Sequence, residues 1–128
     1  MNKTIFLTAV IMGVLAIGLG AFGAHGLEKL VDADSVATFE TGVMYQMYHA
    51  LFLLILAGFV KISERSKKLV FYLIMTGVLF FSFSIYLLAT NSLTTFDFKT
   101  IGFITPIGGL LLILGWIVLG YRGFRNFN

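Results

Sequence analysis

The sequence contains no cysteine, which excludes disulfide bonds, thiol nucleophiles and metal sites built from thiolates. Charge is also scarce, because charged residues make up 12% of the chain, whereas a soluble domain carries roughly a quarter. Apolar residues take their place, at 59% of the chain with a mean hydropathy of +0.97. The composition therefore predicts an integral membrane protein, with residues 1–128 forming a single four-span domain. It argues against nucleic-acid binding, since no basic surface lies outside the apolar segments.

Four apolar segments occupy roughly residues 5–24, 43–60, 69–89 and 101–121. Each is close to the ~20 residues that an α-helix needs to cross the hydrocarbon core. Since lipid offers no hydrogen-bond partner to a bare backbone, all four should be helical. We expect an all-α, multi-pass protein of the cell membrane that folds as a four-helix transmembrane bundle. The first segment ends on Ala21–Phe22–Gly23, which resembles a signal-peptidase site, but we interpret the segment as a retained span.

The basic residues are distributed unevenly over the connecting segments. Lys29 and Lys99 stand alone in the first and third loops. The other seven of the nine occupy the two tails and the linker between the second and third spans: Lys3, Lys61, Arg65, Lys67, Lys68, Arg122 and Arg125. Because cytoplasmic loops carry an excess of lysine and arginine, this bias predicts that the N- and C-termini are both cytoplasmic.

Small residues recur along the first span at alternating intervals of four and three. The series is Ala9, Gly13, Ala16, Gly20 and Gly23. In lipid no hydrophobic effect drives helices together, and a seam of small residues promotes association by allowing close backbone approach. We expect the same helix-packing role for small residues of the other spans, which are Gly42, Gly77, Gly108 and Gly109.

The start of the second span is the most informative stretch of the chain. Gly42, Tyr45, Gln46 and His49 lie at i, i+3, i+4 and i+7, so they share one helix face. An amide and an imidazole inside a span are costly, and they persist only where the face is buried against protein, cofactor or trapped water. We therefore predict that this face points into the bundle, with a neutral His49 imidazole. The candidate buried polar cluster comprises His25, Thr41, Tyr45, Gln46, His49, Ser84 and Thr105.

The third span carries polar or small residues on two opposed sides. Gly77 and Ser84 share one direction, whereas Ser82 and Tyr86 point nearly the other way. Both sides should be contacted, and one contact is open to a neighbouring subunit.

The helix ends of the second and fourth spans carry their own signals. Asp34 or Ser35 is placed to cap the helix that leads into the second span. Thr105 is placed to cap a helix that begins at Pro106. Trp116 should anchor the fourth span at the inner membrane interface.

Three blocks of the chain form a recognisable pattern. They are Gly20–Gly26 (GAFGAHG), Thr41–Ala50 (TGVMYQMYHA), and TPIGG at 105–109 followed by Gly115 and Trp116. This pattern resembles the small bacterial membrane proteins of the domain of unknown function 423 family, which are similar to the eukaryotic transmembrane protein 256. The resemblance spans nearly the whole chain and implies a four-span membrane fold without an established activity. The chain departs from the pattern at Phe83, where glycine is expected between two serines; this side chain should widen a helix contact or face lipid.

The apolar runs contain no Asp, Glu, Lys or Arg, which removes the usual carboxylate machinery of proton pumps and hydrolases. No nucleophile motif is present either, so we expect neither an enzyme nor a metal centre. Straight helices would separate His25 and His49 by roughly 12 Å along the membrane normal, which weakens haem ligation by both unless the glycine-rich end of the first span bends inward.

Three classes of function remain. The first is a structural or assembly protein, surrounded by membrane lipids, that forms a homo-oligomer or holds a membrane-protein partner. The second is a binder of lipid, quinone or haem that uses the aromatic residues around His49. The third is a small channel or transporter with a polar path past Gln46, His49 and Ser84. We favour the first class because no charged pathway is visible.

Overall fold

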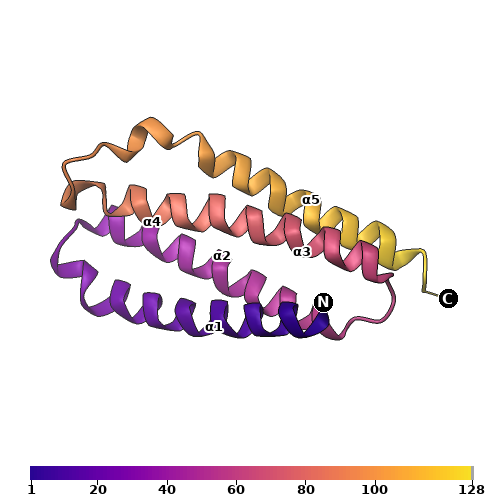
Figure 1. The fold of residues 1–128 in the computed structure, drawn as a ribbon. Helices are drawn as coiled ribbons and strands as arrows, with labels where there is room; N and C mark the ends of the chain where they lie inside the picture. Colours follow the sequence, from indigo (N-terminus) through magenta and orange to yellow (C-terminus); the bar gives the residue numbers. More distant parts are fainter. Residues whose placement is uncertain (128) are drawn as a thin grey trace.

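The computed structural model describes residues 1–127, and over this range it is helical and contains no strand. The long helices are α1 (Asn2–His25), α2 (Ala33–Gly58), α3 (Glu64–Val78) and α5 (Ile104–Phe124) (Figure 1). The third span continues from α3 through a π-helical segment, η2 (Leu79–Phe83), into α4 (Ser84–Ala89). Short 3₁₀ turns occupy the loops: η1 (Leu27–Lys29), η3 (Asn91–Leu93) and η4 (Phe98–Ile101). The all-α fold with four helical stretches long and apolar enough to cross a membrane is therefore confirmed.

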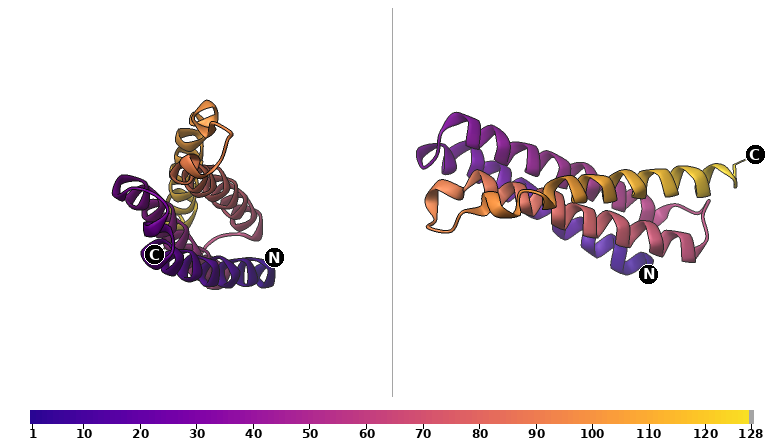
Figure 2. Two further views of the ribbon diagram at one scale, coloured as in Figure 1. Left: turned by 90° about the vertical axis from the view of Figure 1, so that its left-hand side faces the viewer. Right: turned by 90° about the horizontal axis from the view of Figure 1, so that it is seen from above.

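The four spans form two antiparallel hairpins that pack side by side (Figures 1 and 2). The first hairpin joins α1 to α2, and the second joins the third span to α5. Helix α2 meets the third span between them, so these two spans are the inner pair. Their most apolar windows are 39% and 44% buried, against 22% and 17% for the first and fourth spans. Most of the surface of α1 and α5 is therefore left for lipid or for a partner.

Helix α2 begins ten residues before the apolar segment identified from the sequence, because its first turns are polar. Its cap is Asp32, whose carboxylate accepts a hydrogen bond from the Ser35 amide at 2.8 Å. The expectation that Asp34 or Ser35 would be the cap is therefore wrong by two or three positions. The same amide holds the pKa of the Asp32 carboxyl below its ordinary value, because the bond favours the ionised form.

The start of α5 also differs from the expectation. The helix begins at Ile104 after Phe103, and no side chain caps it. Thr105 does not act as a cap, and Pro106 is the third helical residue. The physical reason is a better partner for the Thr105 hydroxyl, which lies 2.6 Å from the Ser84 hydroxyl of α4.

The small residues of the first span face α2. Ala9 and Ala16 are each 1% exposed. A Cβ added at Gly20 would lie 3.4 Å from a Val43 methyl group, and one at Gly23 would lie 3.1 Å from the Phe39 ring. Gly13 continues the seam beside Ala50, at 3.9 Å. The alternating pattern therefore marks the surface through which the first hairpin closes.

Helix α5 crosses the π-helical segment at Gly108 at near-backbone distance. A Cβ added at Gly108 would meet backbone atoms, including the Phe80 carbonyl carbon at 2.7 Å and the Phe81 Cα at 2.8 Å. Gly77 makes a similar contact from the other helix, since its Cβ would lie 2.7 Å from Leu112. The second hairpin therefore closes through glycines on both of its helices.

Substitution of Gly108 tests this backbone contact. Gly108→Ala should destabilise the protein by about 1–3 kcal/mol, because a rigid backbone cannot move aside for the added methyl group. Gly120→Ala on the same helix is the matched control, since nothing lies within 4 Å of its added Cβ. Unfolding in detergent micelles measures both. Equal stability of the two variants would show that the two helices do not meet through Gly108.

Both chain termini and the link between α2 and α3 lie at one end of the molecule (Figure 1). This arrangement gathers the seven basic residues of the tails and linker at that end. The loops that contain Lys29 and Lys99 lie at the opposite end. The side of the membrane that the basic end faces stays a prediction, and the charge bias favours the cytoplasm.

Cysteine labelling of intact cells tests the orientation, helped by the absence of native cysteine. Glu64→Cys and Asp34→Cys lie at opposite ends of the molecule, both at exposed positions, and leave every basic residue in place. An impermeant maleimide should label position 34 from outside and reach position 64 only after permeabilisation. Labelling of position 64 alone in intact cells would reverse the predicted orientation.

Candidate functional site

The side chain of Gln46 joins three helices at the centre of the molecule. It is 3% exposed on the inner face of α2. Its Nε2 donates to the main-chain oxygen of Met12 in α1 at 2.9 Å. Its Oε1 accepts from the Tyr86 hydroxyl of α4 at 2.6 Å. One amide thus connects the two hairpins and uses both its donor and its acceptor ends.

A second hydrogen bond between α2 and the third span lies one turn from Gln46. The Ser82 hydroxyl, fully buried in η2, donates to the main-chain oxygen of Gly42 at 2.8 Å. A Cβ added at Gly42 would lie 2.7 Å from the Tyr86 ring. The absence of a side chain at position 42 therefore allows the third span to approach closely enough for this bond.

The His49 imidazole uses both of its ring nitrogens within the protein. The residue is 4% exposed on α2. Its Nδ1 lies 2.7 Å from the main-chain oxygen of Tyr45, which can only accept, so Nδ1 carries the proton. Its Nε2 accepts from the Trp116 indole nitrogen of α5 at 3.1 Å. The ring is thus held as one neutral tautomer, and the pair links α2 to α5.

Ser84 and Thr105 make a further polar contact between spans, nearer the loop that joins α4 to α5. Their hydroxyl oxygens lie 2.6 Å apart, and the Ser84 hydroxyl oxygen also lies 2.9 Å from the Phe81 main-chain oxygen. Ser84 therefore faces α5 while Ser82 faces α2. As the two-sided pattern of the third span predicted, both sides are contacted, and both contacts belong to this chain rather than to a second subunit.

Three residues of the predicted cluster lie elsewhere. His25 is exposed at the end of α1, which stays helical through His25 instead of bending inward, about 18 Å along the axis from the level of His49. Thr41 bonds to the Ala37 main-chain oxygen of its own helix. Tyr45 is 38% exposed, and only its ring contributes, 4.7 Å from the Phe81 ring. Including His25 and Thr41 in a buried cluster was therefore wrong; for Thr41 the reason is a local backbone acceptor that competes with more distant ones.

Three residues that the structure places in the network were not in the predicted cluster. Ser82 and Tyr86 had been recognised only as a polar side of the third span. Trp116 had been expected at the inner interface, but it lies about 12 Å before the end of α5, within the hydrocarbon. An indole N–H at this depth has no water to bond, and the Nε2 of His49 supplies an acceptor. The available signal was the single tryptophan in an otherwise apolar span.

Two lipid-facing grooves border the network. One has a volume of about 310 Å³ and runs between α2 and α5, lined by Tyr45, His49 and Trp116 among others. The other is about 230 Å³, lies between α1 and the third span, and reaches Gln46. Phe83, the departure from the family pattern, lines the second groove and is 47% exposed, so it faces outward.

Within residues 1–127, no buried side-chain nitrogen or oxygen lacks a hydrogen-bond partner. The same range contains no group of three histidine, aspartate or glutamate residues placed to hold a metal ion. The polar network is therefore closed on itself, and its members satisfy one another.

Comparison with known proteins points to one group. The sequence model of a family described as "Protein of unknown function (DUF423)" matches residues 19–109. A UPF0382 membrane protein of Staphylococcus saprophyticus is 38% identical, covering 96% of this chain and 98% of the relative. The Bacillus subtilis UPF0382 membrane protein YwdK is 38% identical, with 91% and 93% covered. One from Haemophilus influenzae is 36% identical, with 98% and 96% covered. No solved structure matches.

Replacement of Gln46 tests the central bridge. Gln46→Leu should cost about 1–3 kcal/mol of stability, because it leaves the Tyr86 hydroxyl between the helices unpaired. The double variant Gln46→Leu/Tyr86→Phe should recover part of that loss, since both polar partners are then gone. Tyr48→Phe, at a position that is 53% exposed, is the control and should be close to neutral. Additive losses in the double variant, measured by unfolding in detergent, would contradict the bridge.

Proposed function

We propose that this chain, which belongs to the DUF423 family of bacterial membrane proteins, is a non-catalytic membrane module that assembles with a partner inside the bilayer. The partner is a second copy of the chain or another membrane protein. It is a multi-pass protein of the cell membrane, so lipid is its surroundings in either case. The observation that carries the proposal is the closed polar network between the spans, since every buried side-chain nitrogen and oxygen of residues 1–127 has a hydrogen-bond partner.

The other classes fit the same residues less well. A haem iron at His49 would have to displace Trp116 from Nε2 or the Tyr45 carbonyl from Nδ1. A polar path for ions would need the side chains of Gln46 and Ser84 free to exchange partners with water, whereas both bond across helices. Acid–base catalysis would need a group whose proton can move, and the imidazole is already bonded on both sides.

The outer helices supply the surface for assembly. On α1, Ile11, Val14 and Ile17 are 58%, 64% and 67% exposed. On α5, Ile113 and Ile117 are 57% and 58% exposed. Both stripes are apolar, so they are compatible with lipid, and association in the membrane would come from packing against another helix.

Disulfide cross-linking in native membranes tests assembly. Single cysteines at Val14 and Ile117 should give cross-linked products under mild oxidation if α1 or α5 contacts a second copy. Ala16→Cys, at a position that is 1% exposed, is the matched control and should give none. The proposal would be contradicted if neither exposed-position variant gave a cross-linked product and no other membrane protein co-purified in mild detergent.

A second candidate is a binder of lipid or quinone in the groove of about 310 Å³ beside His49. The observation in its favour is the Tyr45 side chain, which lines this groove together with aromatic rings. Native mass spectrometry of His49→Gln distinguishes the two proposed functions. If His49 is only structural, the variant should stay folded and show the same bound molecules as the parent. If His49 helps to bind a ligand, the folded variant should lose a small molecule that the parent retains.

A further inference from the structure

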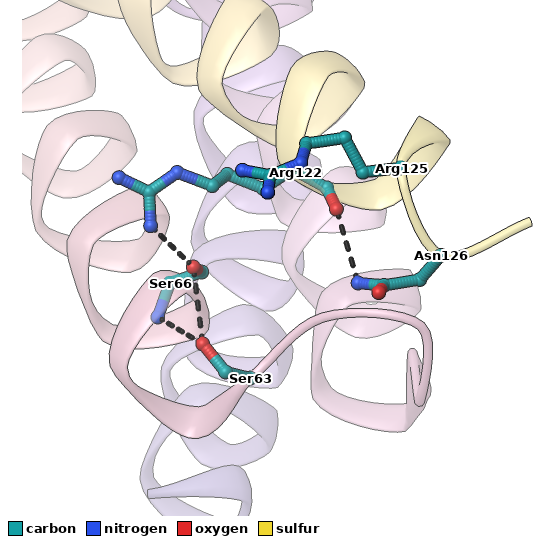
Figure 3. Close-up of a pocket in the computed structure, with 5 residues that line it drawn as sticks. All are labelled: Ser63, Ser66, Arg122, Arg125 and Asn126. Carbon is teal, nitrogen blue, oxygen red and sulfur yellow. Dashed lines mark hydrogen bonds between the residues drawn. The ribbon is translucent and has the colours of Figure 1, made fainter.

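A polar pocket lies at the basic end of the molecule, apart from the network between the spans. Its volume is about 280 Å³, and it is lined by Ser63, Ser66, Arg122, Arg125 and Asn126. The serines belong to the start of α3 and the other residues to the end of α5 and the tail beyond it. Figure 3 shows the Arg122 side chain extending from α5 toward Ser66 in the first turn of α3. The pocket therefore sits where the two helices of the second hairpin begin and end.

The α3 side of the pocket is formed by two serine side chains, Ser63 and Ser66. The Ser63 side chain caps the helix by accepting from the Ser66 amide at 3.1 Å. Ser66 is 3% exposed, and its hydroxyl oxygen accepts from Ser63 at 3.1 Å and from an Arg122 guanidinium nitrogen at 2.9 Å (Figure 3). Ser66 is therefore a buried residue that lines the cavity and holds Arg122 in place there.

The pocket is strongly positive. Within the described chain the one carboxylate paired with a basic side chain is that of Glu64, 3.9 Å from Lys67, so neither arginine is neutralised. Arg122 uses one nitrogen on Ser66 and keeps its other donors. Arg125 lies over the Tyr121 ring, 5.6 Å from its centre, and makes no hydrogen bond to the described residues through its guanidinium. The start of α3 adds the positive end of a helix dipole.

The level of the pocket matches the headgroup region of a bilayer. Arg122 lies eighteen residues after the first residue of α5, which is about 27 Å along the helix axis. The hydrocarbon core is ~30 Å thick, so a span that enters near Ile104 leaves the core close to Arg122. The exposed aromatic residues Tyr121 and Phe124 flank this position, as is typical of a membrane interface. At this depth the nearest anions are the charged headgroups of membrane lipids.

We propose that this pocket binds the phosphate group of an anionic phospholipid. Arg122 and Arg125 provide planar donors that match phosphate oxygens, and the Ser66 hydroxyl positions the Arg122 guanidinium. Basic pockets between transmembrane helices at the membrane surface are suited to such headgroups. The site is independent of the assembly proposed above, because its residues lie outside the network and outside the exposed stripes of α1 and α5.

Lipid retention in native mass spectrometry tests the proposal. The purified chain in detergent is exposed to equimolar phosphatidylglycerol and phosphatidylcholine, and bound lipid is identified by its mass. Phosphatidylglycerol should be retained preferentially. Arg125→Gln should reduce its retention roughly fivefold, and Arg122→Gln/Arg125→Gln by on the order of tenfold or more, since each arginine near the surface contributes separately.

The matched control is Arg65→Gln/Lys68→Gln, which removes the same charge from exposed positions at the same end. It should leave retention within about twofold of the parent, since long-range attraction is screened within a Debye length. The Arg125 side chain makes no hydrogen bond to residues 1–127, so Arg125→Gln should leave the fold intact and a loss of lipid would reflect the pocket. Thermal unfolding of each variant checks this.

Three results would overturn the proposal. Equal loss in the control pair would reduce the effect to general surface charge. Equal retention of phosphatidylcholine would remove selectivity for an anion. Displacement of phosphatidylglycerol by an equal concentration of inorganic phosphate would identify a free anion as the ligand and not a lipid headgroup.

Discussion

The bond pair of Gln46 is the interaction on which the arrangement of the spans depends. Its amide donates to a carbonyl of α1 and accepts from a hydroxyl of α4 while its own backbone is part of α2. In hydrocarbon no solvent can replace a lost partner, so each polar group left unpaired costs about 1–3 kcal/mol. Rotation or sliding of any of the three helices would break the pair. The bridge therefore sets the register between the two hairpins.

Glycine makes the bridge geometrically possible. Helices in lipid do not gain from burying apolar surface against each other, and their association relies on close packing and hydrogen bonds. At Gly42 the absent side chain allows Ser82 to reach the main-chain oxygen of α2. At Gly108 it allows α5 to cross directly against the π-helical segment. Ser82 and Ser84 are two residues apart and point in nearly opposite directions, so Ser82 faces α2 while Ser84 faces α5.

Polar residues have different roles within the spans and at the membrane surface. Those within the spans bond to one another and close the interior, as His49 does with Trp116. Those at the basic end keep unused donors, as Arg122 and Arg125 do around their pocket. The difference follows from solvation, because a charged group is tolerated at the membrane surface and excluded from the hydrocarbon. Interaction with other molecules is therefore favoured at the end and along the apolar flanks, while the centre maintains the fold.

The sequence by itself determined the membrane class, the number of spans, the glycine seam of α1 and the burial of Gln46 and His49. Each of these follows from the spacing of residues along a single helix or from the cost of placing a polar group in lipid. Helix ends were less predictable. Helix α2 starts on a polar turn that hydropathy does not detect, and the Thr105 hydroxyl pairs with Ser84 instead of capping α5.

Only the tertiary structure decided which polar groups pair. Gln46 could have bonded to any span, and its choice of Met12 and Tyr86 depends on how closely the glycines allow three helices to approach. The sequence alone suggests that Trp116 is an interface anchor, but the fold places it against His49. It also suggests that His25 is buried, but α1 stays helical through His25 and leaves it exposed. A sequence states which groups need partners, but the partner is set by distances between helices far apart in the chain.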